Sequence, residues 1–273
     1  MIPKTVSEQA LFSTVQIKTD TGSGTGFFFD FNDSIENVPM LITNKHVIND
    51  DPNKEITLTL HTIDPSTNIM ENITTSYKPT WYFHSTKDLC FCLIGPLFHQ
   101  LHAKGILPYF ISVGEKIIAT KDKLATLDAL EEVTMVGYPI GLSDKINNFP
   151  IFRKGSTASH PAADFNEPGI ALVDMACFPG SSGSPIYIYN KSVNSDKKGN
   201  TILREESVIL LGILFAGPTY TATGEIKIST IPTSQKVFTQ TPIMTNLGYY
   251  IKAAEIFEFK SIIESIINTY NNN

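Results

Sequence analysis

One stretch of the chain reads Val173-Asp174-Met175-Ala176-Cys177-Phe178-Pro179-Gly180-Ser181-Ser182-Gly183-Ser184-Pro185-Ile186, a Gly/Ser-rich loop between two apolar runs that are typical of strands. Glycines on both sides of the Ser181–Ser182 pair allow a tight turn and leave the Ser182 hydroxyl open to approach. Ser182 is therefore a candidate nucleophile, and the backbone amides of Gly180 and Ser182 could together stabilise a developing oxyanion. The same loop also fits a plain hairpin turn of an all-β protein, because glycine-serine motifs recur on unrelated folds.

A serine hydroxyl needs a neutral imidazole as general base and a carboxylate that orients this imidazole. Of the six histidines, His46 follows an apolar, strand-like run, Met40-Leu41-Ile42-Thr43. Asp88 stands at the start of another apolar run, where it is either a solvated loop charge or the buried partner of an imidazole. Asp50 and Asp51 compete for the second role, but they follow His46 too closely in a polar loop, and we interpret them as solvated.

Four motifs occur along the chain in the order His, Asp, Ser: Gly-Ser-Gly-Thr-Gly-Phe (22–27), Thr-Asn-Lys-His-Val (43–47), Lys-Asp-Leu-x-x-x-Leu-Ile (87–94) and Pro-Gly-Ser-Ser-Gly-Ser-Pro (179–185). Together they resemble the trypsin-like serine peptidases of the chymotrypsin fold, most closely the bacterial branch that includes the HtrA/Deg proteases. The glycine-proline turn 136–141 also resembles that branch. The resemblance covers nearly the whole chain.

The resemblance implies a catalytic role for three residues. His46 would be the general base, Asp88 its orienter and Ser182 the nucleophile, with the amides of Gly180 and Ser182 as the oxyanion hole. The activity implied is that of a serine endopeptidase, which cleaves peptide bonds through an acyl-enzyme and needs no cofactor or metal.

The expected fold class is all-β, with two six-stranded antiparallel β-barrels, as the resemblance implies. The helical spacing of apolar residues between Ala253 and Tyr270 indicates a C-terminal α-helix. We expect an N-terminal barrel over residues 1–115, a C-terminal barrel over 116–251, and a helix and tail over 252–273. Short alternating runs separated by turn residues independently indicate a barrel or sandwich in the first half. The candidate site would lie between the barrels, where a cleft can accept an extended peptide.

The resemblance also places a substrate pocket. Ala176 would lie at the base of the pocket for the side chain that precedes the cut, and Phe215, Ala216 and Gly217 would form its wall. A carboxylate at the base would pair with Arg or Lys, and Ala176 offers none. We therefore expect cleavage after small or medium apolar residues.

One position departs from the digestive members of the family. They place an aspartate just before the serine, where it pairs with a newly cut N-terminus, and this chain has Ser181 there. Because the chain also begins at its own Met1, we do not expect activation by N-terminal clipping. Control would come from an activating protein partner, from restricted access, or from an ordering loop such as 143–167 or the Thr/Pro/Ser-rich, less regular segment 219–241.

Composition narrows the class of partner. The 273 residues carry a formal net charge of −6 and no basic run, which argues against nucleic acid and against an anionic membrane surface. A protein or peptide substrate is the expected partner. The N-terminus has no signal-like sequence, and no apolar run approaches the length of a membrane span, so we expect a cytoplasmic location.

The three cysteines fit a reduced compartment, since Cys90 and Cys92 lie two apart on one expected strand and cannot easily bridge. A zinc site from Cys90, Cys92 and a histidine, or a metal held by His99 and His102, is the alternative that this composition leaves open.

Two other functions remain open at this stage. The first is a latent or inactive protease-fold protein that binds partners or serves as a scaffold within a complex. The second is an esterase or acyl-transferase, because the same triad chemistry serves all acyl transfer.

Overall fold

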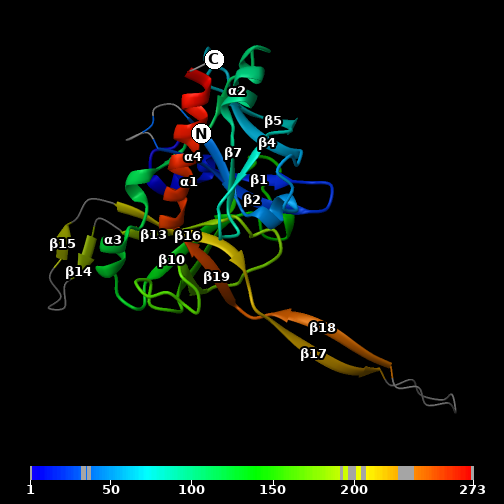
Figure 1. The fold of residues 1–273 in the computed structure, drawn as a ribbon, viewed down its shortest axis with the longest axis vertical. Helices are drawn as coiled ribbons and strands as arrows, with labels where there is room; N and C mark the ends of the chain where they lie inside the picture. The colour runs from blue at the N-terminus through cyan, green and yellow to red at the C-terminus, as the bar shows by residue number, and fades with distance from the viewer. Residues whose placement is uncertain are drawn as a thin grey trace.

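Strands dominate the structure and form two large β systems and two small hairpins (Figure 1). The computed structural model describes residues 2–31, 35, 38–190, 193–195, 201–203, 207–226 and 237–271. No helix in this part of the chain is long and apolar enough to cross a membrane.

The first β system is a nine-stranded sheet whose main path runs β5-β4-β1-β2-β3-β7-β6, with β8 paired to β4 and β9 paired to β2. Its strands are β1 (Thr14–Lys18), β2 (Ser23–Asp30), β3 (Met40–Thr43), β4 (Ile56–Ile63), β5 (Met70–Tyr77), β6 (Trp81–Phe83), β7 (Cys90–Leu93), β8 (Pro108–Tyr109) and β9 (Val113–Gly114).

The second β system is the closed six-stranded barrel that the sequence predicts, in the order β10-β11-β12-β19-β16-β13. Its strands are β10 (Glu132–Gly137), β11 (Ile151–Thr157), β12 (Ile170–Asp174), β13 (Pro185–Asn190), β16 (Ser207–Ala216) and β19 (Leu247–Lys252). The all-β fold class is thus confirmed, and the trypsin-like arrangement of two β systems is present.

The first half differs in detail from the six-stranded barrel that we expected. Its sheet has nine strands, and among the described residues hydrogen bonding does not join its outer strands, β5 and β6, to each other. β6 has three residues, and β5 is largely exposed and polar. Short or polar outer strands are a common way in which proteins leave a sheet edge open without inviting aggregation.

Two hairpins extend from the second barrel. β14 (Val193–Ser195) pairs with β15 (Thr201–Leu203), and β17 (Thr219–Ile226) pairs with β18 (Val237–Met244). Figure 1 shows the second hairpin projecting from the barrel. The segment 219–241, which the sequence suggests to be less regular, therefore contains two paired strands, while its residues 227–236 lie outside the described part of the chain.

The helices are short except at the C-terminus. They are α1 (Val6–Ser13), α2 (Gly95–His102), α3 (Lys121–Ala125) and α4 (Glu258–Asn271), with single 3₁₀ turns η1 (Lys45–Ile48), η2 (Glu115–Ile117), η3 (Pro139–Gly141) and η4 (Ala253–Phe257). α1 begins with a capping box, in which Thr5 and Glu8 exchange side-chain hydrogen bonds with each other's backbone amides. The C-terminal helix expected from the apolar spacing is present as η4 and α4.

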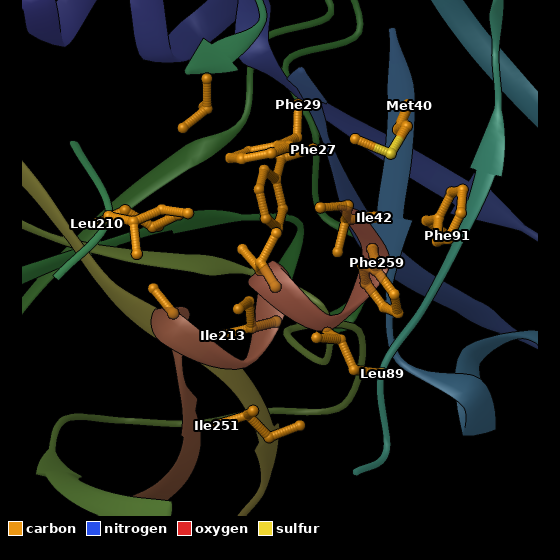
Figure 2. Close-up of a cluster of buried hydrophobic side chains, with 14 of the residues drawn as sticks. Phe27, Phe29, Met40, Ile42, Leu89, Phe91, Leu210, Ile213, Ile251 and Phe259 are labelled. Atoms are coloured by element: carbon orange, nitrogen blue, oxygen red, sulfur yellow. The ribbon is translucent and has the colours of Figure 1, made fainter. Parts of the chain in front are cut away.

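Strand alternation explains how the core is divided. Successive side chains of a strand point to opposite faces, so on β2 Phe28 packs inside the first sheet while Phe27 and Phe29 point the other way. Figure 2 shows Phe27 and Phe29 in a cluster with Ile213 and Ile251 of the second barrel, and with residues of η4 and α4. A shared core therefore joins the two β systems and the C-terminal segment. The domain limits at residues 115 and 251 stay a prediction.

Candidate active site

His46 and Asp88 meet at one end of the first sheet. β3 pairs antiparallel with β7, with Thr43 opposite Cys90, so the residue after β3 and the residue before β7 emerge side by side. His46 lies on η1 directly after β3, and Asp88 lies in the turn before β7. The His46 Nδ1 atom is 2.5 Å from Asp88 Oδ2, and the His46 backbone N–H donates to Asp88 Oδ1 at 3.2 Å.

This contact determines what the imidazole can do. The carboxylate accepts a hydrogen bond from Nδ1–H, which leaves Nε2 as the nitrogen that can exchange a proton with a reacting group. The His46 side chain is 44% exposed and that of Asp88 28% exposed, so both side chains of the pair are partly open to solvent. Asp50 and Asp51, the competing carboxylates, lie exposed in the loop after η1.

The Asn44 side chain supports the turn that contains Asp88. Its side-chain amide donates to the Asp88 carbonyl oxygen at 2.7 Å, and Asn44 is fully buried. The Asp88 residue is thus held at its backbone by one side chain and at its carboxylate by another.

Ser182 lies in the loop between β12 and β13 and is joined to β2 by backbone hydrogen bonding. The Thr25 N–H donates to the Ser182 carbonyl oxygen at 2.8 Å, and the Thr43 hydroxyl donates to the Thr25 carbonyl oxygen at 2.7 Å. Thr43 stands three residues before His46. Two hydrogen bonds through Thr25 therefore connect the serine loop to the strand that carries His46.

Close packing around Gly183 explains why the loop needs glycine. Its φ is +84°, a conformation that L side chains rarely adopt, and a Cβ atom there would lie 1.9 Å from the Thr25 carbonyl oxygen. The Gly183 N–H donates to the Leu214 carbonyl oxygen at 2.8 Å, which ties the loop to β16. No larger residue could occupy this position without moving the two β systems apart.

The peptide between Pro179 and Gly180 has a fixed orientation. The Ile140 N–H donates to the Pro179 carbonyl oxygen at 2.6 Å, and the Thr25 hydroxyl donates to the Gly180 carbonyl oxygen at 2.9 Å. Because the C=O and N–H of a trans peptide point in opposite directions, the Gly180 N–H is directed away from Ile140. The first hydrogen bond orients this peptide, and the second orients the next one, between Gly180 and Ser181.

Ile140 is itself strained. It has φ +55°, which is unfavourable for a β-branched residue, and its side chain is 70% exposed. The turn 138–141 is fixed by the Tyr138 N–H, which donates to the Thr25 hydroxyl at 3.0 Å, and by the Gln16 amide, which donates to the Gly141 carbonyl oxygen. The strain therefore lies at the turn that orients the Pro179–Gly180 peptide.

The expected pocket residues lie around the loop. Ala176 and Phe215 are half-buried, and Phe215 packs on Tyr249 with 6.3 Å between ring centroids. Ala216 is exposed at the end of β16 and Gly217 follows it. A Cβ at Gly248 would lie 2.5 Å from the Cys177 sulfur, so this thiol fills the space beside Gly248, and burial raises its pKa to about 11.

Cys90, Cys92 and Cys177 are free and buried, and burial raises the pKa of the Cys90 and Cys92 thiols far above the ordinary value. Among the described residues, no group of three or more His, Cys, Asp or Glu side chains could hold a metal ion. His99 and His102 lie on α2, outside the region of His46 and Ser182.

Sequence reasoning missed the residues that hold this arrangement together. Thr25 contacts the serine loop and the 138–141 turn at once, and Asn44 supports the Asp88 turn. Thr25 lies in the motif 22–27 and Asn44 in the motif 43–47, so their membership of these motifs is the sequence signal that could have identified them. Neither residue is the serine, the histidine or the carboxylate that triad chemistry needs, and the sequence therefore gives no chemical reason to select it. Ser181, whose side chain is fully buried, stands where digestive relatives carry an aspartate.

Comparisons with known proteins show the family to which the chain belongs. The family model of the trypsin-like peptidase domain matches residues 24–193. No curated protein matches the chain. Two similar solved structures are an inactive form of a mutant of Rv3671c from M. tuberculosis H37Rv, at 14% identity and TM-score 0.45, and the scabies mite inactivated protease paralogue S-I1, at 12% identity and TM-score 0.46. The first covers 95% of this chain and 90% of its own, and the second 95% and 96%.

Proposed function

Because the chain belongs to the trypsin-like peptidase family, we propose that it is a serine endopeptidase whose catalytic residues are His46, Asp88 and Ser182. The observation that carries this proposal is the 2.5 Å contact between His46 Nδ1 and Asp88 Oδ2. A carboxylate in this position selects the imidazole tautomer that a general base requires and stabilises the imidazolium that forms.

The proposed reaction has two halves. His46 Nε2 takes the proton of the Ser182 hydroxyl as the oxygen attacks the scissile carbonyl, and the same proton passes to the leaving amine as the peptide bond breaks. Water then repeats the sequence on the acyl-enzyme and releases the second product. The amides of Gly180 and Ser182 would donate to the oxyanion of each tetrahedral intermediate, and the fixed Pro179–Gly180 peptide supports that assignment for Gly180.

The substrate would be a polypeptide cut after a small or medium apolar residue. Ala176 offers no charge to a basic side chain, and the Cys177 thiol narrows the space beside Gly248. Ala216 and Gly217 would leave room for the substrate backbone to pair with the end of β16. Three further points stay predictions: a cytoplasmic location, membership of the HtrA-like branch, and control by an activating protein partner.

Labelling with a fluorophosphonate probe tests the proposal. We expect the wild type to be labelled, and Ser182→Ala and His46→Ala to lose the label, because the probe reacts only with an activated serine. Ser265→Ala, at an exposed serine of α4, is the matched control and should label like the wild type.

An unlabelled but folded wild type would contradict the proposal and favour the alternative, a latent protease-fold protein that acts as a scaffold within a complex. Labelling together with ester hydrolysis but no cleavage of a peptide library would instead favour an esterase or acyl-transferase.

A further inference from the structure

The turn that presents Asp88 is tied to the C-terminal segment of the chain. Glu258, the first residue of α4, accepts two hydrogen bonds from Ser85: one from the backbone N–H at 2.6 Å and one from the hydroxyl at 2.9 Å. These residues are 173 positions apart in the sequence. The contact therefore links the end of the chain to the three residues that precede Asp88.

His84 connects this carboxylate to the residue next to Asp88. Its ring is 1% exposed, and its Nδ1 atom accepts from the Thr86 N–H at 3.2 Å and from the Lys87 N–H at 3.0 Å. A nitrogen that accepts two hydrogen bonds carries no proton, so the ring proton is on Nε2. His84 is therefore a neutral Nε2–H imidazole.

The Nε2 side of His84 faces two carboxylates. Nε2 lies 3.1 Å from Glu258 Oε2 and 3.3 Å from Glu255 Oε2. Neither contact has the alignment of a strong hydrogen bond, so the attraction is chiefly that between the N–H dipole and the two negative charges. The ring thus bridges the carboxylates on one side and the amides of Thr86 and Lys87 on the other.

The charge states fit this bridge. Burial lowers the pKa of His84, and Lys45 and Lys87 lower it further, against the raising effect of Glu258 and Glu255. Burial would raise the pKa of Glu258, but the two hydrogen bonds from Ser85, together with the positive charge of Lys45, favour the ionised form, and that pKa lies below its usual value. A neutral histidine beside an ionised glutamate is the combination that the geometry requires.

Phe259 packs the start of α4, which carries Glu258, against the core. Phe259, next to Glu258, is fully buried and lies 4.7 Å from the Phe91 ring and 6.0 Å from the His84 ring. Figure 2 shows Phe259 beside Phe91, Leu89 and Ile42. Ile42 lies on β3, before the His46 turn, while Leu89 follows Asp88 directly and Phe91 lies on β7. The start of α4 is thus anchored in the shared core.

We propose that His84, Glu255 and Glu258 form a C-terminal clasp that sets the position of Asp88 against His46, with His84 as a positioning residue. This inference rests on the proposed function, since it names what places the orienting carboxylate. It gives the C-terminal segment a role in the reaction that acts through Asp88.

Two matched substitutions test the clasp, each in the full chain. His84→Asn keeps an acceptor near the Thr86 and Lys87 amides but loses the donor toward the glutamates. Glu258→Gln keeps the size of the side chain and removes its charge. Glu264→Gln, at an exposed glutamate on the same helix, makes the same change in net charge away from the clasp.

We expect kcat for a peptide or ester substrate to fall about 10- to 100-fold in His84→Asn and in Glu258→Gln, with KM within about twofold of wild type, because small displacements of a catalytic group cost this much. The double variant should lose little more than either single variant, since both remove one bridge. Glu264→Gln should match the wild type.

A second measurement does not depend on activity. The proton between His46 Nδ1 and Asp88 should give a strongly downfield ¹H resonance that Asp88→Asn abolishes. We expect the clasp variants to broaden it or shift it upfield while circular dichroism shows a folded chain. If both clasp variants leave kcat and this resonance as in Glu264→Gln, the clasp is overturned.

The two proposals can fail separately. An inactive wild type that shows the resonance, with the resonance lost in the clasp variants, refutes the endopeptidase and supports the clasp. Should His84→Asn fail to fold, Glu258→Gln alone decides the outcome.

Discussion

The contacts that hold the Asp88 carboxylate and its turn come chiefly from side chains, whereas those that hold Ser182 and Gly183 use the backbone groups of these two residues. On the first side, the His46 ring and the Asn44 amide reach Asp88, and neither contact requires glycine. On the second side, Ser182 and Gly183 are held through their own carbonyl and amide groups. A polar side chain can be replaced without moving the chain, but a glycine that packs against a carbonyl cannot. The two sides should therefore respond differently to substitution.

The largest effect is expected from Asp88→Asn. The amide keeps the size of the side chain but loses the charge that stabilises the imidazolium, so we expect kcat to fall about 10³- to 10⁴-fold with little change in the free energy of unfolding. Steady-state hydrolysis and urea unfolding measure the two quantities. Asp50→Asn, at an exposed acid nearby, is the control, and an equal loss there would show that the effect is not specific to the His46 contact.

Gly183→Ala, unlike Asp88→Asn, should act mainly on the free energy of unfolding. A Cβ at this residue would collide with the Thr25 carbonyl oxygen in a backbone conformation that alanine disfavours. We expect the free energy of unfolding to drop by about 4 kcal/mol, enough to unfold a marginal domain. Urea denaturation beside Gly22→Ala, where nothing lies within 4 Å, makes the comparison. A stable Gly183→Ala variant would mean that the loop at Ser182 and Gly183 is not held rigidly against Thr25.

Acid should weaken the first sheet through His61. This residue is 8% exposed between Phe12 and Phe149, and burial lowers its pKa to about 4. Because the folded-state pKa lies below the ordinary value of 6.5, the unfolded chain binds the proton first. Stability is therefore complete above about pH 6.5 and is lost as pH falls toward 4, by on the order of 3 kcal/mol.

Urea unfolding between pH 7 and pH 4 measures this loss. His61→Leu removes the titrating group and should flatten the pH dependence. Phe149→Leu loosens the same packing but keeps the imidazole, so it should lower stability at every pH and leave the slope in place. An unchanged slope in His61→Leu would assign the acid sensitivity to other groups.

The smallest effect on stability is expected at Thr25, the β2 residue that contacts the serine loop and the 138–141 turn. Thr25→Val removes the hydroxyl that accepts from the Tyr138 N–H and donates to the Gly180 carbonyl oxygen, and it leaves a buried donor unpaired. We expect a loss of about 2 kcal/mol in unfolding free energy. Thr25→Ser keeps the hydroxyl and should retain most of the stability. Equal losses in the two variants would point to packing of the methyl group instead of the hydrogen bonds.

The amino-acid sequence alone indicated the class of fold and the residues on which the proposed chemistry depends. His46, Asp88 and Ser182 could be singled out because each sits beside an apolar run or between glycines, and these local patterns depend on neighbouring residues only. The C-terminal helix also followed from periodicity, which is a local property, whereas the closed second barrel was expected from the family resemblance. The family match over residues 24–193 agrees with that part of the interpretation.

Only the tertiary structure decided how these residues are held. The open nine-stranded first sheet, the paired strands within 219–241 and the clasp of His84, Glu255 and Glu258 all depend on contacts between distant segments. Nothing around His84 in the sequence distinguishes it from a surface histidine, and Glu258 is one acidic residue among many. Their meeting is set by the burial of Phe259 in the shared core, and packing of that kind is a property of the folded chain and not of any one stretch of it.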